Sequence, residues 1–126
     1  RVQTLFPPLK IFWDKQAHAL SGGQKQMLAI ARAIIERREL ILIDEPTKGL
    51  APAIIRDMIT VFREIAEETT VLLVEQNFRF AQTVADRHYI VEQGKVIANG
   101  TLDVVLTDEA VQRSYFGAMA AETEPC

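Results

Sequence analysis

The sequence predicts an α/β fold built around a parallel βαβ unit. Three observations carry this prediction: two short apolar runs, an amphipathic segment between them, and a later pair of segments separated by a Gln-Gly turn. The apolar runs are Leu40–Ile43 and Thr70–Val74, and their length and continuity are typical of strands that are buried on both faces. Strands joined by a helix pair in parallel through a right-handed crossover. We therefore expect a parallel sheet in the middle of the chain and a β-hairpin after it.

The composition is that of an ordinary globular chain. The 126 residues are 48% apolar and 25% charged, which is enough for one domain or one lobe of a domain. The net charge is −3 with both signs interspersed, so we expect no nucleic-acid partner. The single cysteine, Cys126, cannot form a disulfide within the chain, which fits a reducing compartment. No apolar run approaches the ~18 residues of a membrane-spanning helix.

The first half of the chain predicts two helical segments before the first strand. We interpret Val2–Phe6 as the tail of a helix that Pro7 and Pro8 stop. The next helix opens at Ser21, and Gln24 three residues later completes a capping-box pattern. Helical spacing predicts the inward face of this helix to be Met27, Leu28, Ala31, Ile34 and Ile35.

After the first strand, Pro52 suits the first turn of a helix whose predicted inward face is Ile55, Met58, Ile59, Phe62, Ile65 and Ala66. Asn77 is predicted to cap a short helix reaching about Ala85, with Phe78, Ala81 and Val84 or Ala85 inward. A hairpin follows from His88–Glu92 through a Gln93-Gly94 turn to Lys95–Ala98. Thr101 and Thr107 are predicted N-caps of two terminal helices, and residues 118–126 a frayed tail.

The segment Leu20-Ser21-Gly22-Gly23-Gln24 is the first that suits phosphate chemistry. Glycines lack a Cβ, so their backbone amides can approach an anion closely. The helix that starts here adds unsatisfied N–H groups and a partial positive charge, and Ser21 adds a hydroxyl. Taken alone, a Ser-Gly-Gly sequence is equally well a simple turn before a helix.

The second such segment is Ile41–Glu45, an apolar run that ends in two carboxylates. Ligands of parallel α/β sheets bind at the carboxyl ends of the strands, where Asp44 could hold Mg²⁺ and Glu45 could polarise a water. The alternative, that the two acids only solvate a strand end, loses weight because the pair follows the glycine motif by about twenty residues. His18 and His88 have no partners at metal-ligand spacing, so we expect them to have surface or packing roles.

These two motifs, in this order, resemble the signature and Walker B motifs of the ABC-transporter ATPases, and the resemblance runs from about Leu5 to Gly117. Asp44–Pro52 (DEPTKGLAP) and Leu72–Asn77 (LLVEQN) resemble more narrowly the branched-chain amino acid importers and their urea and amide relatives. The resemblance implies a partial P-loop NTPase fold. Residues 1–38 would end the helical subdomain and carry the signature motif and helix, residues 39–117 would form the Walker B, D-loop and switch-loop lobe, and residues 118–126 the tail.

The resemblance also implies a role for each site residue. Leu20–Gln24 would contact the ATP γ-phosphate bound to a partner subunit, with Ser21 and Gly23 closest. Asp44 would act on Mg²⁺, and Glu45 would be the catalytic base or water-orienting carboxylate. Gln76 stands at the switch position, where most of the family carries histidine, and glutamine can donate a hydrogen bond but cannot titrate near neutral pH. The D-loop between the two sites would consist of Lys48, Gly49, Leu50 and Ala51.

The phosphate-cradling pattern G-x-x-x-x-G-K-[ST] does not occur in the sequence. The resemblance places this Walker A half upstream of Arg1, so we expect a fragment that binds ATP weakly or not at all alone. With that half, the subunit would hydrolyse ATP with Mg²⁺ to power the import of branched-chain amino acids. It would form a head-to-tail dimer with a second ATPase subunit and dock on integral membrane permease subunits, peripherally at the cytoplasmic face of the inner (plasma) membrane.

Two other functions stay open at this point. The chain could be the C-terminal signature lobe of a split or chromosome-type ABC ATPase, which a coiled coil upstream of Arg1 would favour. It could also be a non-catalytic docking module, which the missing P-loop favours and the intact Asp44-Glu45 pair opposes.

Overall fold

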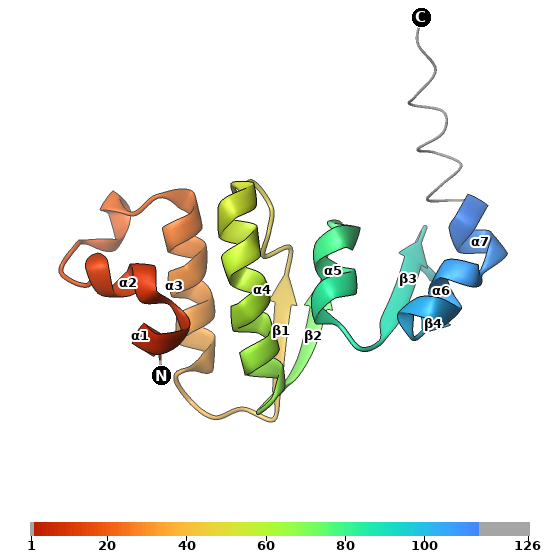
Figure 1. Cartoon of the computed structure of the whole chain (residues 1–126), viewed down its shortest axis with the longest axis horizontal. Helices are drawn as coiled ribbons and strands as arrows, with labels where there is room; N and C mark the ends of the chain where they lie inside the picture. Colours follow the sequence, from red (N-terminus) through yellow and green to blue (C-terminus); the bar gives the residue numbers. More distant parts are fainter. Residues whose placement is uncertain (1, 114–126) are drawn as a thin grey trace, which may run out of the picture. The chain divides into compact units, whose positions relative to one another are not determined.

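The computed structural model describes residues 2–113, which form two compact units (Figure 1). The first unit extends to Val84 and holds α1 to α5, β1 and β2, and the second starts at Ala85. The predicted tail, residues 118–126, and the predicted end of the lobe at 117 lie outside the described residues. No described helix has the length and apolar character needed to cross a membrane.

The N-terminal segment folds as two short helices rather than one that the prolines stop. Helix α1 spans Val2–Leu5, and α2, Pro7–Ile11, begins at the prolines themselves. Proline is tolerated in a first helical turn because the N–H that it lacks would have no partner there. Phe6 between the helices is 1% exposed, whereas Ile11 and Trp13 remain on the surface.

A single 3₁₀ turn, η1 (Ala17–Ala19), leads into α3 (Gly22–Ile34), which begins with the predicted capping box. The Ser21 side chain accepts a hydrogen bond from the Gln24 amide, and the Gln24 side chain accepts one from the Ser21 amide. The predicted inward face is confirmed for Met27, Ala31 and Ile34, which are buried. It also includes Ile30 and lacks Ile35. Ile30 is buried at the centre of this face, and Ile35 lies just past the helix and is exposed.

The parallel pairing predicted for the middle of the chain is confirmed. Strand β1 (Leu40–Asp44) pairs with β2 (Thr70–Val74), and Asp44 lies opposite Val74. The prediction of burial on both faces is wrong for the described residues. Ile41 and Ile43 face the helices and are buried, but the alternate side chains Leu40, Leu42, Leu72 and Val74 are more than half exposed. Figure 1 shows α3, α4 and α5 beside this strand pair, and the core that they share covers one face of it.

Helix α4 (Pro52–Ala66) starts with the predicted proline and joins the two strands. It packs on α5 (Phe78–Val84), where Phe62 and Phe80 meet edge to face with ring centroids 5.3 Å apart. The inward face predicted for α5 is wrong in its aromatic residue, since Phe80 is buried and Phe78 is only partly buried. Val84 packs against the core as predicted. Phe78 and Phe80 have the same ring, and Phe80 takes the buried position because its ring meets that of Phe62 on α4.

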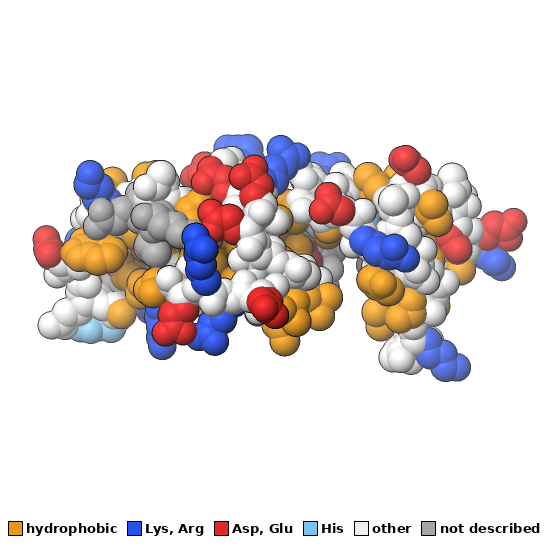
Figure 2. Space-filling view, turned by 90° about the horizontal axis from the view of Figure 1, so that it is seen from below, with side chains coloured by type: hydrophobic (Ala, Val, Ile, Leu, Met, Phe, Trp, Pro, Cys, Tyr) orange, Lys and Arg blue, Asp and Glu red, His pale blue; other side chains and the backbone are white. Residues whose placement is uncertain are grey.

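The second unit is the predicted hairpin with two short helices. Strands β3 (His88–Glu92) and β4 (Lys95–Gly100) pair antiparallel, and α6 (Leu102–Thr107) and α7 (Glu109–Val111) follow. The core of this unit comprises Ile90, Val105 and Val111. Apolar side chains also reach the surface among charged ones (Figure 2).

The predicted cap at Thr107 is wrong. Thr107 is the last residue of α6, and its hydroxyl donates back to the carbonyl oxygens of Asp103 and Val104. Asp108 caps α7 instead, because its carboxylate accepts from the amides of both Ala110 and Val111. Thr101 takes the N-cap position of α6 with extended backbone angles, but its side chain makes no capping hydrogen bond.

Candidate functional site

The two predicted carboxylates lie at the carboxyl end of β1. Asp44 is the last residue of the strand and is exposed. Glu45 extends the strand ladder by one bond, since its amide donates to the Val74 carbonyl at 2.8 Å, and then turns the chain with a φ of +42°. A left-handed conformation is uncommon for a residue with a side chain, and such residues concentrate at functional sites. This turn carries the Glu45 side chain over the edge of the sheet.

Both oxygens of the Glu45 carboxylate have a partner from a predicted site residue. Gln76 Nε2 donates to Glu45 Oε1 at 2.7 Å, although the two residues are 31 positions apart. Lys48 Nζ lies 2.5 Å from Glu45 Oε2. The hydrogen bond to Glu45, and after it the charge of that carboxylate, raise the pKa of Lys48 above its usual value. The structure therefore brings Glu45, Lys48 and Gln76 together.

Glu75 is a site residue for which sequence reasoning assigned no role. Its Oε2 accepts from the amide of Thr47 at 3.2 Å and from the Thr47 hydroxyl at 2.8 Å. Its Oε1 accepts from the amides of Gln76 and Asn77, both at 2.9 Å. One carboxylate thus joins the loop after β1 to the loop after β2. The sequence feature that could have identified Glu75 is its place directly after an apolar run and directly before Gln76 and the helix-capping Asn77.

These loops form an open pocket of about 240 Å³ that is lined by polar and charged residues. Its lining consists of Glu45, Thr47, Lys48, Glu75, Gln76 and Asn77. Donors and acceptors converge there, as a site that orients a water or a phosphate oxygen requires. The lining side chains offer two carboxylates, one ammonium, one hydroxyl and two side-chain amides, those of Gln76 and Asn77.

The donor set also bears on Mg²⁺. No cluster of three or more His, Cys, Asp or Glu side chains occurs within residues 2–113, so these residues build no complete cage for a metal ion. Mg²⁺ usually binds through one or two carboxylates and completes its shell with water and substrate phosphates. The exposed Asp44 at the strand end fits this partial role.

The glycine motif lies where α3 begins. Its capping box engages the amides of Ser21 and Gln24. The amides of Gly22 and Gly23 lie in the first turn of the helix, where no carbonyl four residues earlier in the helix can accept from them. Gly22 is exposed with open space around it, whereas Gly23 is buried. Leu20 is 7% exposed, so its side chain belongs to the core, and only its backbone is available to a ligand.

The predicted D-loop connects the carboxylates with the glycine motif. Lys48 reaches back to Glu45, and Gly49 turns the chain with a φ of +71°. A Cβ built on Gly23 would lie 3.6 Å from Leu50 Cδ2 and 2.6 Å from Ile54 Cδ1. Ala51 takes the N-cap position of α4 without a side-chain bond. The two motifs that the sequence separates by twenty residues are thus linked through one loop.

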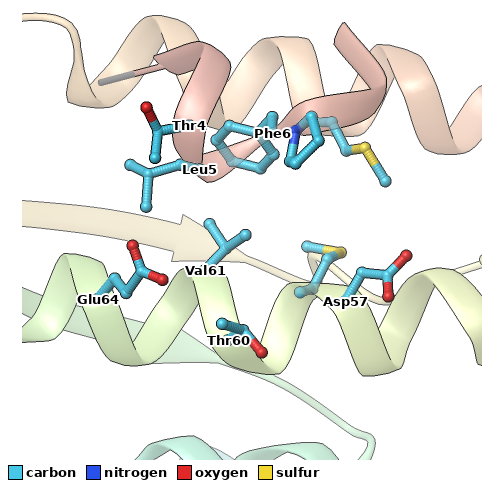
Figure 3. A pocket seen from close by; sticks show the side chains of 10 residues that line it. Thr4, Leu5, Phe6, Asp57, Thr60, Val61 and Glu64 are labelled. Carbon is cyan, nitrogen blue, oxygen red and sulfur yellow. The ribbon is translucent and has the colours of Figure 1, made fainter.

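A larger cavity of about 370 Å³ lies between the α1–α2 segment and α4. Its apolar lining includes Leu5, Phe6 and Val61 together with Pro7, Met27 and Met58. Asp57 and Glu64 lie along α4 beside it (Figure 3). It holds no predicted site residue and no base or nucleophile paired for catalysis. We place the chemistry in the smaller pocket because that is where acid, amide and ammonium groups meet.

Neither histidine joins the site. His18 is exposed, and His88 is buried in β3 with no hydrogen bond to either ring nitrogen from the described residues. These positions agree with the surface and packing roles expected from the sequence.

Comparison with known proteins points to one family. The ABC transporter family profile matches residues 6–48. The high-affinity branched-chain amino acid transport ATP-binding protein BraG of Pseudomonas aeruginosa is 42% identical over 93% of this chain and 51% of its own length. The probable branched-chain amino acid transport ATP-binding protein LivF of Archaeoglobus fulgidus is 38% identical over 89% of this chain and 48% of its own. ATP-binding proteins of other transport systems match as well.

Solved structures agree with these relatives. A nucleotide-free ATP-binding cassette from an ABC transporter superposes with a TM-score of 0.77 at 28% identity, over 90% of this chain and 47% of that chain. A dimeric cassette in a post-hydrolysis state with ADP and Pi superposes with a TM-score of 0.60 at 29% identity, over 68% of this chain and 37% of that one. The chain spans about half the length of the curated relatives that it matches.

Proposed function

We propose that this chain, which belongs to the ATP-binding subunits of ABC transporters, corresponds to their C-terminal half and supplies the hydrolytic half of the ATPase site of an importer. The observation that carries the proposal is the Glu45 carboxylate at the end of β1 with the Gln76 amide on its Oε1 at 2.7 Å. Two of the relatives named above, BraG and LivF, are branched-chain amino acid transport ATP-binding proteins, which favours that class of solute.

The proposed chemistry assigns one task to each group. Glu45 accepts a hydrogen bond from the attacking water and orients it toward the γ-phosphorus. Gln76 holds Glu45 through Oε1 and donates to the phosphate oxygen when the substrate is bound. Asp44 helps to hold Mg²⁺, which neutralises charge on the phosphate oxygens when it is bound. In this structure Lys48 donates to Glu45 Oε2, so a water that binds this oxygen shares it with the ammonium or displaces the ammonium.

The glycine motif is proposed to act on a second subunit. The free amides of Gly22 and Gly23, the Ser21 hydroxyl and Gln24 would contact the γ-phosphate bound to the partner's P-loop. A two-fold head-to-tail dimer completes both sites at once. We propose that Lys48–Ala51 lie at this interface, because this loop connects Glu45 with the helix of the glycine motif. The dimer would dock on integral membrane permease subunits at the cytoplasmic face of the membrane.

The first test is the coding sequence upstream of Arg1. An in-frame G-x-x-x-x-G-K-[ST] and Q-loop are expected there. A coiled coil upstream would support a chromosome-type ATPase instead, and a start codon directly before Arg1 would support a docking module. Titration of the 126-residue chain with Mg-ATP is expected to show no binding at micromolar concentrations, and micromolar affinity would contradict the division of the site.

The second test addresses Glu45 in the intact subunit, meaning this chain with its P-loop half. Glu45→Gln keeps the size of the side chain but removes the negative charge, so we expect at least a 100-fold loss of kcat while ATP stays bound. The matched control is Glu67→Gln, which removes a carboxylate from the exposed end of α4 and should leave kcat unchanged. Phosphate release at saturating ATP measures both variants, and normal turnover by Glu45→Gln would refute the assignment.

A further inference from the structure

The Glu75 carboxylate is the most highly connected polar group of the site. It accepts four hydrogen bonds, two on each oxygen, at distances of 2.8 to 3.2 Å. The donors on one oxygen belong to Thr47 in the loop after β1. Those on the other are the amides of Gln76 and Asn77 in the loop after β2. Charge-assisted bonds to a carboxylate are about twice as strong as neutral ones, so this set fixes both loops.

Each loop that Glu75 fastens carries one member of the Glu45–Gln76 pair. Thr47 lies two residues after Glu45, and its side chain is 5% exposed, so its hydroxyl has no free access to water. Gln76 lies directly after Glu75, and its backbone amide is one of the four donors. The bond from Gln76 Nε2 to Glu45 Oε1, at 2.7 Å, closes a ring of contacts between the two loops.

We propose that Glu75 is a positioning residue for hydrolysis, which holds Gln76 on Glu45 by fastening the switch loop to the loop after β1. The proposal rests on the proposed function of Glu45. A glutamine side chain has three rotatable bonds and therefore many orientations, and a fixed backbone at Gln76 limits those from which Nε2 can reach Glu45 at 2.7 Å. When Glu75 is intact, one orientation of Gln76 dominates and Glu45 Oε1 stays bonded to Gln76. The water then binds at Oε2, the oxygen that accepts from Lys48 in this structure.

Substitution by glutamine removes the symmetry on which this arrangement depends. Both oxygens of the carboxylate accept, and every one of the four partners is a donor. In Glu75→Gln, the amide oxygen can still accept from the donors of one loop. The NH₂ group cannot accept, so the donors of the other loop lose their acceptor. Thr47→Val removes only the hydroxyl bond at nearly the same volume, and Thr47→Ser restores that bond. Glu67→Gln is the control for the loss of a carboxylate.

The first measurement uses the 126-residue chain and needs no nucleotide. Amide hydrogen exchange, read by NMR, is expected to quicken at least 10-fold at Thr47, Gln76 and Asn77 in Glu75→Gln, and to stay unchanged there in Glu67→Gln. Unchanged exchange in Glu75→Gln would overturn the proposal, because the carboxylate would then not be fastening the loops. If Glu75→Gln does not fold, amide exchange at Thr47 in Thr47→Ser and Thr47→Val tests the bonds between Thr47 and Glu75, and faster exchange is expected only in Thr47→Val.

The second measurement uses the intact subunit and separates positioning from general stability. Glu75→Gln is expected to lower kcat at least 10-fold and to change the KM for ATP less than twofold, with Thr47→Val intermediate and Thr47→Ser near wild type. In a Gln76→Ala background, Glu75→Gln should lower kcat no further, because Glu75 acts through Gln76. A full additional loss in that background, or an unchanged kcat in Glu75→Gln alone, would overturn the proposal.

The two measurements also distinguish this inference from the proposed function. If the wild-type intact subunit does not hydrolyse ATP, the proposed function fails and the positioning role falls with it, whatever the exchange data show. If the wild type hydrolyses ATP and only the Glu75 variants behave unexpectedly, the proposed function stands and the role of Glu75 alone is refuted.

Discussion

Gly23 offers a sharp test of how the glycine motif is built into the fold. It is the second residue of α3, and its missing side chain leaves room for the start of α4. A Cβ at this position would lie 2.6 Å from Ile54 Cδ1, whereas ordinary contacts of this kind fall at 3.4–4 Å. Gly23→Ala therefore forces an overlap of about 1 Å between the two helices, unless Ile54 moves.

Two effects of opposite sign determine how far Gly23→Ala changes the free energy of unfolding. Overpacking a well-filled site costs typically ~1–3 kcal/mol, and the lower end applies here because Ile54 Cδ1 is the end of a side chain that can rotate. Alanine gains up to ~1 kcal/mol over glycine inside a helix, and less in the first turn. We expect a net loss of about 1 kcal/mol in the free energy of unfolding.

Urea denaturation of the 126-residue chain measures this loss. The control is Gly22→Ala, because Gly22 lies one residue earlier with nothing within 4 Å of its built Cβ. That change should leave stability equal or raise it by a few tenths of a kcal/mol. A double-mutant cycle adds Ile54→Val, which deletes Cδ1 and costs about 0.5–1.5 kcal/mol alone.

In the Ile54→Val background, Gly23→Ala should cost almost nothing, which gives a coupling of about 1 kcal/mol. Equal losses in both backgrounds would show that the contact with Ile54 is not what requires glycine. An equal effect of Gly22→Ala and Gly23→Ala would refute the packing argument altogether.

Two further predictions concern the ion pair and the core. The pKa of Lys48 is raised above its ordinary value of 10.5, so its pair with Glu45 adds stability below that value and loses it as the pH rises through the higher folded pKa. The difference in urea midpoint between wild type and Lys48→Met should therefore be constant from about pH 7 to 9 and disappear at more alkaline pH. Phe80→Ala should cost about 3–5 kcal/mol because Phe80 is 1% exposed, and about 0.5–1.5 kcal/mol less in a Phe62→Leu background, where the edge-to-face partner is gone; equal costs in urea denaturation in the two backgrounds would contradict the ring contact.

The elements predicted correctly are those that local sequence signals specify. The capping box at Ser21, the proline at the start of α4 and the Gln93-Gly94 turn each depend on residues a few positions apart. The wrong cap at Thr107 shows the limit of such signals. Thr107 and Asp108 are neighbours with similar propensities, and the carboxylate takes the cap because it accepts two amides at once.

The burial of the strands could not be predicted from their own residues. A continuous apolar run looks the same whether one or both faces are covered, because the covering elements lie elsewhere in the sequence. Within residues 2–113 the helices cover only the face of Ile41 and Ile43, and Leu42 on the other face is 68% exposed. The prediction of Phe78 as the inward aromatic residue of α5 fails for a related reason, since Phe80 finds its partner, Phe62, only in the packed structure.

Predicting the candidate site requires both the identity of its residues and the register of the two strands that carry them. Glu45 and Gln76 are recognisable in the sequence, but their contact depends on the parallel pairing that sets Asp44 opposite Val74. The next residues along the two strands are Glu45 and Glu75, so both loops leave the sheet at the same level. A shift of one residue in this pairing would turn every side chain of one strand to the opposite face and separate Glu45 from Gln76. The bonds from Glu75 to Thr47 span the same edge, and they resist such a shift at the position where the proposed chemistry requires it.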